Sequence, residues 1–126
     1  MTLYYFLLIV VTEVLLVAGQ IFWKLGMKAN PFNMSLILQP YILIGFGIYG
    51  IATVIWMFVL SKVDVSIAYP LNSMGYVFLL FAAWLVLGEE ITVPKIVGII
   101  VITIGIVILA MDASSVEKFI RLFSRR

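Results

Sequence analysis

Four long apolar stretches constrain this chain to a bundle of membrane-spanning helices. They cover residues 3–23, 41–60, 65–87 and 94–111. Each approaches or reaches the roughly 20 residues that an α-helix needs to cross a bilayer. Lipid contains no water to hydrogen-bond backbone amides and carbonyls, and a helix satisfies these groups within itself. The sequence therefore predicts an all-α integral membrane protein with four transmembrane helices. Residues 24–40 are the longest predicted loop, and Gly88 is predicted to end the third helix.

The composition agrees with a membrane protein and argues against an enzyme. Of the 126 residues, 65% are hydrophobic and 11% are charged, whereas a soluble domain carries about 25% charge. The chain has no cysteine and no histidine, so the common zinc and thiol sites have no ligands. The net charge of +2 is modest. We expect no catalysis, no cofactor or metal, and no nucleic-acid partner.

The last 14 residues, 113–126, differ from the transmembrane domain predicted for residues 1–112. Ser114 and Glu117 fit a capping box, S-x-x-E, at the start of a helix. Apolar residues then recur at helical spacing, and the positive charge comes from Lys118, Arg121, Arg125 and Arg126. We expect a short amphipathic helix anchored on anionic headgroups at the membrane surface. A frayed, solvated terminus is the alternative.

The distribution of basic residues sets the expected orientation. The side that holds both termini carries five lysines and arginines, and the opposite side carries three. By the positive-inside rule, this difference favours cytoplasmic termini in a multi-pass protein of the inner cell membrane. Without the tail the bias reverses, so the sequence also permits both orientations in one membrane.

Three of the apolar stretches each carry one polar or aromatic face. Helical spacing groups Glu13, Gln20 and Lys24 in the first, Tyr49, Thr53 and Trp56 in the second, and Tyr69, Asn72, Ser73 and Tyr76 in the third. Such groups avoid lipid, so the three faces should converge on a shared cavity. We predict that all of these residues except Lys24 and Thr53 bind a substrate or a proton there. Alternatively, the polar groups only hold helices together, Trp56 lies in the interfacial belt and Lys24 snorkels to the surface.

Glu13 is the strongest candidate for a functional residue. An ionised acid at the middle of a span costs about 2.5–3.5 kcal/mol on insertion scales, and helix packing does not require one. An acid in such a position can exchange a proton for a cation. The competing interpretation is a purely structural acid.

The fourth apolar stretch carries a different signal. Gly98 and Gly105 lie seven residues apart on one face of a helix that has no charge in this region. Small residues at this spacing let two helices approach closely. We therefore expect a dimer joined through this face, and lipid-facing flexibility is the alternative.

Several segments resemble the small multidrug resistance transporters within the drug/metabolite, EamA-like, transporter superfamily. These are "IAY" at 67–69, "GEEITVPKIVG" at 88–98 and the glycine pair Gly98/Gly105. The resemblance implies a dimer, frequently antiparallel, joined through the glycine pair. It also implies a substrate site between the first three helices of both subunits.

Within that superfamily, two segments resemble the paired subunits of the aminoarabinose-phosphoundecaprenol flippase. They are "WMFVLSKVDVSIAYPLNS" at 56–73 and "VAGQIFWK" at 17–24. The cation exporters differ in two respects. Their glutamate lies eight residues before a lysine, whereas Glu13 lies eleven before Lys24, and they carry a tryptophan where this chain has Asn72. An amide there suits a sugar or a phosphate better than an aromatic cation.

Two functions therefore compete, with a third from a different class. The first is a flippase that moves a polyprenyl-phosphate-linked sugar or amino sugar across the cytoplasmic membrane. The second is a proton-coupled exporter of small organic cations, with Glu13 as the shared site. The third is an accessory subunit that only scaffolds a glycosyltransferase. We favour the first, with a homodimer or a paired heterodimer as the functional unit.

Overall fold

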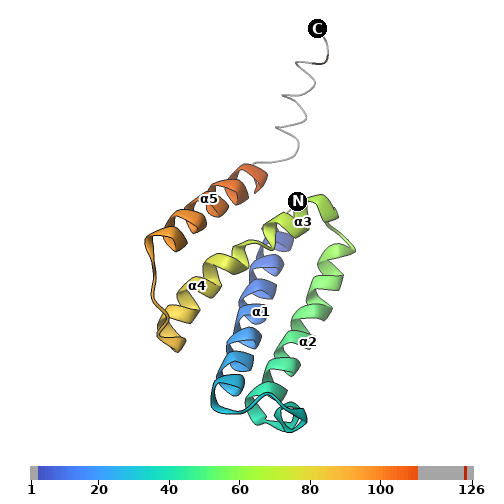
Figure 1. The fold of residues 1–126 in the computed structure, drawn as a ribbon. Helices are drawn as coiled ribbons and strands as arrows, with labels where there is room; N and C mark the ends of the chain where they lie inside the picture. Colours follow the sequence, from blue (N-terminus) through green and yellow to red (C-terminus); the bar gives the residue numbers. More distant parts are fainter. Residues whose placement is uncertain (1–2, 111–123, 125–126) are drawn as a thin grey trace.

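The computed structural model describes residues 3–110 and residue 124, and the first 108 of these form a bundle of helices. In chain order the elements are α1 (Leu3–Ala29), the 3₁₀ helix η1 (Met34–Leu38), α2 (Pro40–Leu60), α3 (Val65–Leu71), α4 (Met74–Leu87) and α5 (Val93–Ala110) (Figure 1). No strand occurs in this part of the chain. The all-α prediction is confirmed, and the predicted tail helix with Lys118, Arg121, Arg125 and Arg126 lies outside the described residues.

Helices α1 and α2 form an antiparallel pair with close backbone contact (Figure 1). A Cβ atom at Gly19 would lie 3.2 Å from the carbonyl oxygen of Gly45, and the indole of Trp23 fills the space beside Gly45. Larger residues at these two positions would force the helices apart. The two glycines therefore set the α1–α2 separation.

The first helix is longer than predicted. It runs to Ala29 rather than ending near residue 23, because no helix-breaking residue occurs until Pro31. The residue before a proline is biased away from helical geometry, and here that residue is Asn30, whose side chain donates to the carbonyl of Gly26 at 2.9 Å. The predicted loop of residues 24–40 is correspondingly shorter.

The remaining connection between α1 and α2 is ordered by two side-chain caps. Asn33 caps η1 by accepting a hydrogen bond from the amide of Ser35. Gln39 caps α2 by accepting from the amide of Ile42 at 3.2 Å, with Pro40 at the first helical position. Both caps satisfy amides that a helix start leaves without a partner.

The third apolar stretch was predicted as one helix, and this prediction is wrong in detail. It is broken into α3 and α4 at Asn72 and Ser73. Pro70 lies inside α3, two residues before this break, and it has no amide hydrogen to donate to the carbonyl four residues earlier. Short-range bonds replace the helical ones here, including Ser73 amide to Pro70 carbonyl at 3.0 Å and Gly75 amide to Asn72 carbonyl at 3.1 Å.

The buried core lies at the end of the bundle where α3 meets α1 and α2 (Figure 1). It is made by one apolar residue of α1, one of α2, one of the following turn, two of α3 and the first of α4: Ile9, Val59, Val63, Ala68, Leu71 and Met74. Because α3 and the start of α4 are anchored in this core, the break between them is held at a fixed place beside α1.

Helix α5 follows an extended connection, residues 88–92, and packs mainly on α3 and α4 (Figure 1). As predicted, Gly88 ends the preceding helix in a left-handed conformation, with φ of 67°, which glycine adopts without strain. Three helical segments, 3–28, 40–60 and 65–87, are long and apolar enough to cross a membrane, and Val93–Ile108 forms a shorter apolar helix.

Candidate functional site

A polar cavity of about 220 Å³ lies between α1, α2, α3 and α4 near the middle of the bundle. Its lining combines a carboxyl, two amides and four hydroxyls with apolar and glycine positions: Glu13, Leu16, Val17, Gln20, Tyr49, Tyr69, Asn72, Ser73, Gly75, Tyr76 and Leu79. Tyr69 and Tyr76 are 53% and 62% exposed. The cavity is therefore open on the side of these two tyrosines rather than sealed inside one chain.

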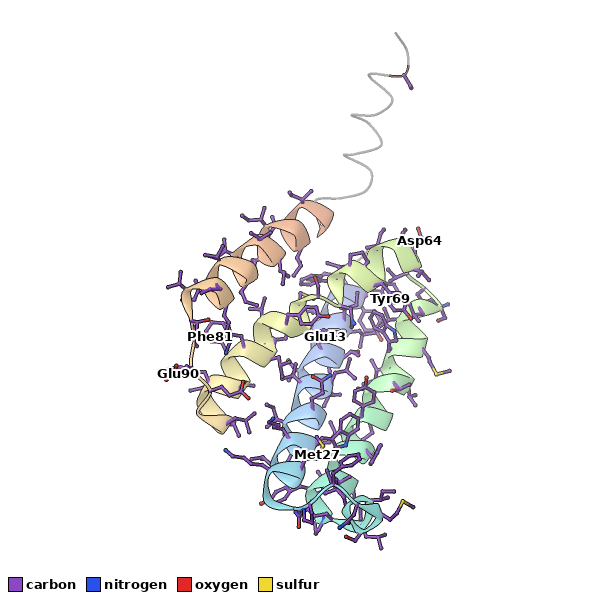
Figure 2. The ribbon with its side chains drawn as sticks, in the orientation of Figure 1. Glu13, Met27, Asp64, Tyr69, Phe81 and Glu90 are labelled. Atoms are coloured by element: carbon purple, nitrogen blue, oxygen red, sulfur yellow. The ribbon has the colours of Figure 1, made fainter. Side chains whose placement is uncertain are left out.

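Glu13 is the charged group buried deepest in this cavity, with only 3% of its surface exposed. Figure 2 shows it midway along α1, where α4 crosses. Its Oε1 atom is buried and has no hydrogen-bond partner, while Oε2 lies against Gly75. A buried polar group without a partner costs about 1–3 kcal/mol, and more when it is charged. The carboxyl is thus set to receive a proton or a cationic group.

The break in the third stretch places a polar segment opposite this carboxyl. Asn72 follows α3, and its Oδ1 atom is buried without a hydrogen-bond partner. The hydroxyl of Ser73 donates to the carbonyl of Pro70 at 2.6 Å. Gly75 is the second residue of α4, so the Glu13 carboxyl lies at the N-terminal end of that helix, where the helix dipole favours negative charge.

Aromatic residues outside the cavity support its tyrosine walls. The ring of Trp23 stacks on Tyr49, with centroids 5.0 Å apart and planes at 28°. The ring of Trp56 meets Tyr69 edge to face, with centroids 5.5 Å apart and planes at 87°. Such pairs contribute about 0.5–1.5 kcal/mol beyond the area they bury. They therefore fix the positions of two of the three tyrosine rings.

The structure brings together seven of the eight residues predicted for the binding site. These are Glu13, Gln20, Tyr49, Tyr69, Asn72, Ser73 and Tyr76. Trp56 does not line the cavity and stands behind Tyr69 instead. Thr53 also lies outside the lining, and its hydroxyl donates to the carbonyl of Tyr49 at 2.8 Å. Whether the seven residues bind substrate stays a prediction.

Sequence reasoning missed two kinds of residue in the site. Gly75 was not singled out, although it lies three residues after Asn72, one helical turn along the same polar face. Leu16, Val17 and Leu79 supply apolar walls, and nothing distinguishes them from lipid-facing neighbours in the sequence. Lys24, grouped with Glu13 by helical spacing, lines a different hollow with Lys28 and Glu89.

Two larger hollows are almost wholly apolar. One, of about 490 Å³, lies under η1 between the ends of α1 and α2, and the other, of about 510 Å³, lies between α1 and α4. The second is lined by aliphatic and phenylalanine side chains. Neither contains an acid or a base, so neither can select a polar substrate. The smaller polar cavity, unlike these two hollows, contains a charged group, Glu13.

Apolar helices around a polar cavity with a buried carboxyl are typical of membrane transport proteins. Residues 1–111 match the EamA-like transporter family, and the chain belongs to that family. The predicted family resemblance is thereby confirmed. No solved structure matches the chain.

Among curated proteins, the chain is similar to subunits of one lipid flippase. One relative is the probable 4-amino-4-deoxy-L-arabinose-phosphoundecaprenol flippase subunit ArnE of Enterobacter sp. (strain 638). The two sequences are 40% identical over 60 residues, which make up 48% of this chain and 56% of that protein. The chain is 38% identical over 64 residues, 51% of its length, to the ArnE proteins of Salmonella paratyphi B and Salmonella newport, and covers 58% of each. The match thus spans somewhat more than half the length of these relatives.

Proposed function

We propose that the chain is a subunit of a flippase that moves a polyprenyl-phosphate-linked amino sugar across the cytoplasmic membrane. One observation carries this proposal. Glu13 and Asn72 line the same polar cavity, and Oε1 of the first and Oδ1 of the second are both buried without a hydrogen-bond partner. The similarity to ArnE proteins, whose names specify such a flippase, supports the same substrate class.

Several polar groups of the cavity have a counterpart in an amino-sugar head group. The carboxylate of Glu13 would pair with the ammonium group, which removes the cost of burying either charge alone. Asn72 Oδ1 would accept from a sugar hydroxyl. The tyrosine hydroxyls would donate to the remaining sugar oxygens, while the polyprenyl tail stays in lipid.

The cavity also supports a dimer as the working unit. Its 220 Å³ falls short of the about 300–1,000 Å³ of common ligand pockets, and its open side carries two exposed tyrosines. A second subunit placed there would enlarge and close the site. Helix α5 offers a face for this contact, since nothing lies within 4 Å of a Cβ atom added at Gly98 or Gly105.

We further propose that α5 is the fourth transmembrane helix. Its 18 residues span about 27 Å at 1.5 Å per residue, close to the about 30 Å of the hydrocarbon core. With four spans, both termini lie on one side. Residues 1–112 would then form the transport domain, and residues 113–126 would add a membrane-surface anchor.

A second function competes, because a buried acid equally suits a proton-coupled exporter of small organic cations. Glu13 would then bind the proton and the cation in turn, which is a common use of an acid within a membrane span. Asn72 favours the flippase, since an amide offers hydrogen bonds to a sugar but no stacking surface to an aromatic cation.

One reconstitution separates the two functions. The protein, purified together with any subunit that accompanies it, is placed in vesicles and tested for lipid-linked sugar translocation and for proton-driven cation uptake. We expect translocation, reduced at least tenfold by Glu13→Gln, because loss of one charged partner in a buried pair costs about 3–5 kcal/mol. Glu90→Gln, which removes an exposed acid, serves as the control. Cation uptake that disappears with Glu13→Gln, without lipid translocation, would establish the exporter instead.

A further inference from the structure

A second charged hollow, of about 380 Å³, opens at the end of the bundle that holds η1. It is lined by Lys24, Met27 and Lys28 of α1, by Leu87 at the end of α4, and by Glu89. It shares no lining residue with the polar cavity. We propose that this hollow is a docking site for the lipid head group at the membrane surface, where the two lysines bind the phosphate and Glu89 binds the amino group.

The charges of this hollow are available to a ligand. Lys24, Lys28 and Glu89 are all exposed, and within the described part of the chain their side chains form no hydrogen bond or ion pair. By contrast, Lys95 on the neighbouring helix donates to the carbonyl of Glu90 at 2.8 Å. The hollow therefore presents two basic side chains and one acidic side chain to a ligand, and none of the three is engaged in a hydrogen bond or ion pair within the described part of the chain.

The spacing of the two lysines favours an anion between them. Lys24 and Lys28 are four residues apart on α1, so their side chains lie on the same face one turn apart. Like charges in this arrangement destabilise a helix by about 0.2–0.5 kcal/mol. Lys28 is accounted for by its place in the last turn of α1, where the helix dipole favours a cation. That explanation does not extend to Lys24, more than one turn before the end.

The hollow and the polar cavity must bind the head group in sequence. Glu13 and Lys24 are eleven residues apart on one helix, a rise of about 16 Å, which exceeds the length of a single sugar ring. Gln20 lies between them, one turn before Lys24, and lines the polar cavity. It supplies a polar step on the path from the surface to Glu13.

This inference rests on the proposed function for its ligand, because the mixed charges of the hollow match a phosphodiester with a nearby amino group. Phosphatidylethanolamine has the same two charges, and it is the alternative source of this chemistry. A polyprenyl phosphate that carries a neutral sugar lacks the amino group and isolates the role of Glu89.

The test measures binding of three lipids to the purified protein in phosphatidylcholine nanodiscs. The lipids are a polyprenyl-phosphate-linked amino sugar, its neutral-sugar counterpart and phosphatidylethanolamine. We expect Lys24→Gln and Lys28→Gln each to weaken binding of both sugar lipids about fivefold, the usual effect of one basic residue at a membrane surface. Glu89→Gln should abolish the preference for the amino sugar over the neutral one. Lys62→Gln, an exposed lysine in the turn after α2, should change nothing.

Three outcomes would overturn the proposal. The first is unchanged binding in both lysine variants. The second is a preference for the amino sugar that survives Glu89→Gln, which would mean that Glu89 does not bind the amino group. The third is phosphatidylethanolamine binding as tightly as the amino-sugar lipid, which would make the lysines general anchors.

The failure of this inference is distinguishable from failure of the proposed function. Glu13→Gln should leave surface binding intact while it reduces translocation. Normal binding at the lysines without any translocation by the wild-type protein would refute the flippase and leave the docking site standing. Translocation that is normal in both lysine variants would refute the docking site alone.

Discussion

The Oε2 atom of Glu13 occupies the space in which a side chain at Gly75 would begin. A glycine on α4 thus lets the carboxyl of α1 sit against the start of another helix. This contact joins two of the four helices that line the polar cavity, and the acid can hold this position only because residue 75 has no side chain.

Gly75→Ala should displace the Glu13 carboxyl and reduce transport nearly as much as Glu13→Gln does. A Cβ atom at this position overlaps Oε2, which is the far end of a flexible side chain, so the carboxyl should move away at little cost in stability. Transport in vesicles and thermal unfolding in detergent measure the two effects. Gly47→Ala is the matched control, since nothing lies within 4 Å of its added Cβ. If Gly75→Ala transports normally, the carboxyl does not act from this position.

Asn72→Leu should have opposite effects on stability and on binding. The buried Oδ1 atom has no hydrogen-bond partner, so replacing it with an apolar group removes an unsatisfied acceptor and should raise the unfolding temperature. Loss of a hydrogen bond to the sugar should weaken binding of the lipid-linked sugar about twofold to tenfold. Calorimetry measures the change in unfolding temperature, and binding in nanodiscs measures the change in affinity for the lipid-linked sugar. Unchanged sugar binding would contradict the role of Asn72.

Pro70→Ala should lower transport without lowering stability. Alanine restores the amide hydrogen that proline lacks and removes its ring, so we expect α3 and α4 to merge and Asn72 to rotate away from Glu13. Transport should fall several-fold while thermal unfolding stays the same or improves. Pro94→Ala, in the first turn of α5, provides the comparison. A fully active Pro70→Ala protein would show that the break is not needed.

Gly98→Leu or Gly105→Leu should weaken dimerisation. Both positions are exposed, and an added Cβ atom meets nothing within 4 Å at either one, so each substitution adds bulk to the proposed contact face. Gly98 also lines a hollow between α4 and α5, so Gly105→Leu is the variant that tests the contact face alone. Crosslinking in membranes and size in detergent report the oligomer. Gly50→Leu on α2 adds the same bulk at an equally open position, and its dimer should be unaffected. Dimers of normal strength in both α5 variants would refute the interface.

Much of the fold could be predicted from the sequence because lipid leaves few alternatives. Apolar length alone located the spans, and Gly88 marked a helix end that the structure confirms with a positive φ. The break at Asn72 and Ser73 was missed although Pro70 was visible. Proline is tolerated within transmembrane helices, so its presence alone does not show whether a helix kinks or separates into two.

The site was predictable where periodicity determines which residues share a face. Helical spacing grouped Glu13 with Gln20 and Tyr69 with Tyr76, and packing of the helices brought both groups to one cavity. Spacing within one helix shows which residues share a face, but it cannot show which part of that face each neighbouring helix contacts. For this reason Lys24 was grouped with Glu13, whereas the structure assigns it to the hollow formed with Glu89.

The tryptophans behind the cavity give the protein a built-in optical reporter. Trp23 stacks on Tyr49 and Trp56 contacts Tyr69, while both tyrosines line the cavity and neither tryptophan does. A ligand that shifts either tyrosine ring changes the surroundings of an indole without touching it. Intrinsic fluorescence of a Trp84→Phe protein, which lacks the exposed third indole, can therefore follow occupancy of the cavity in real time and without a label.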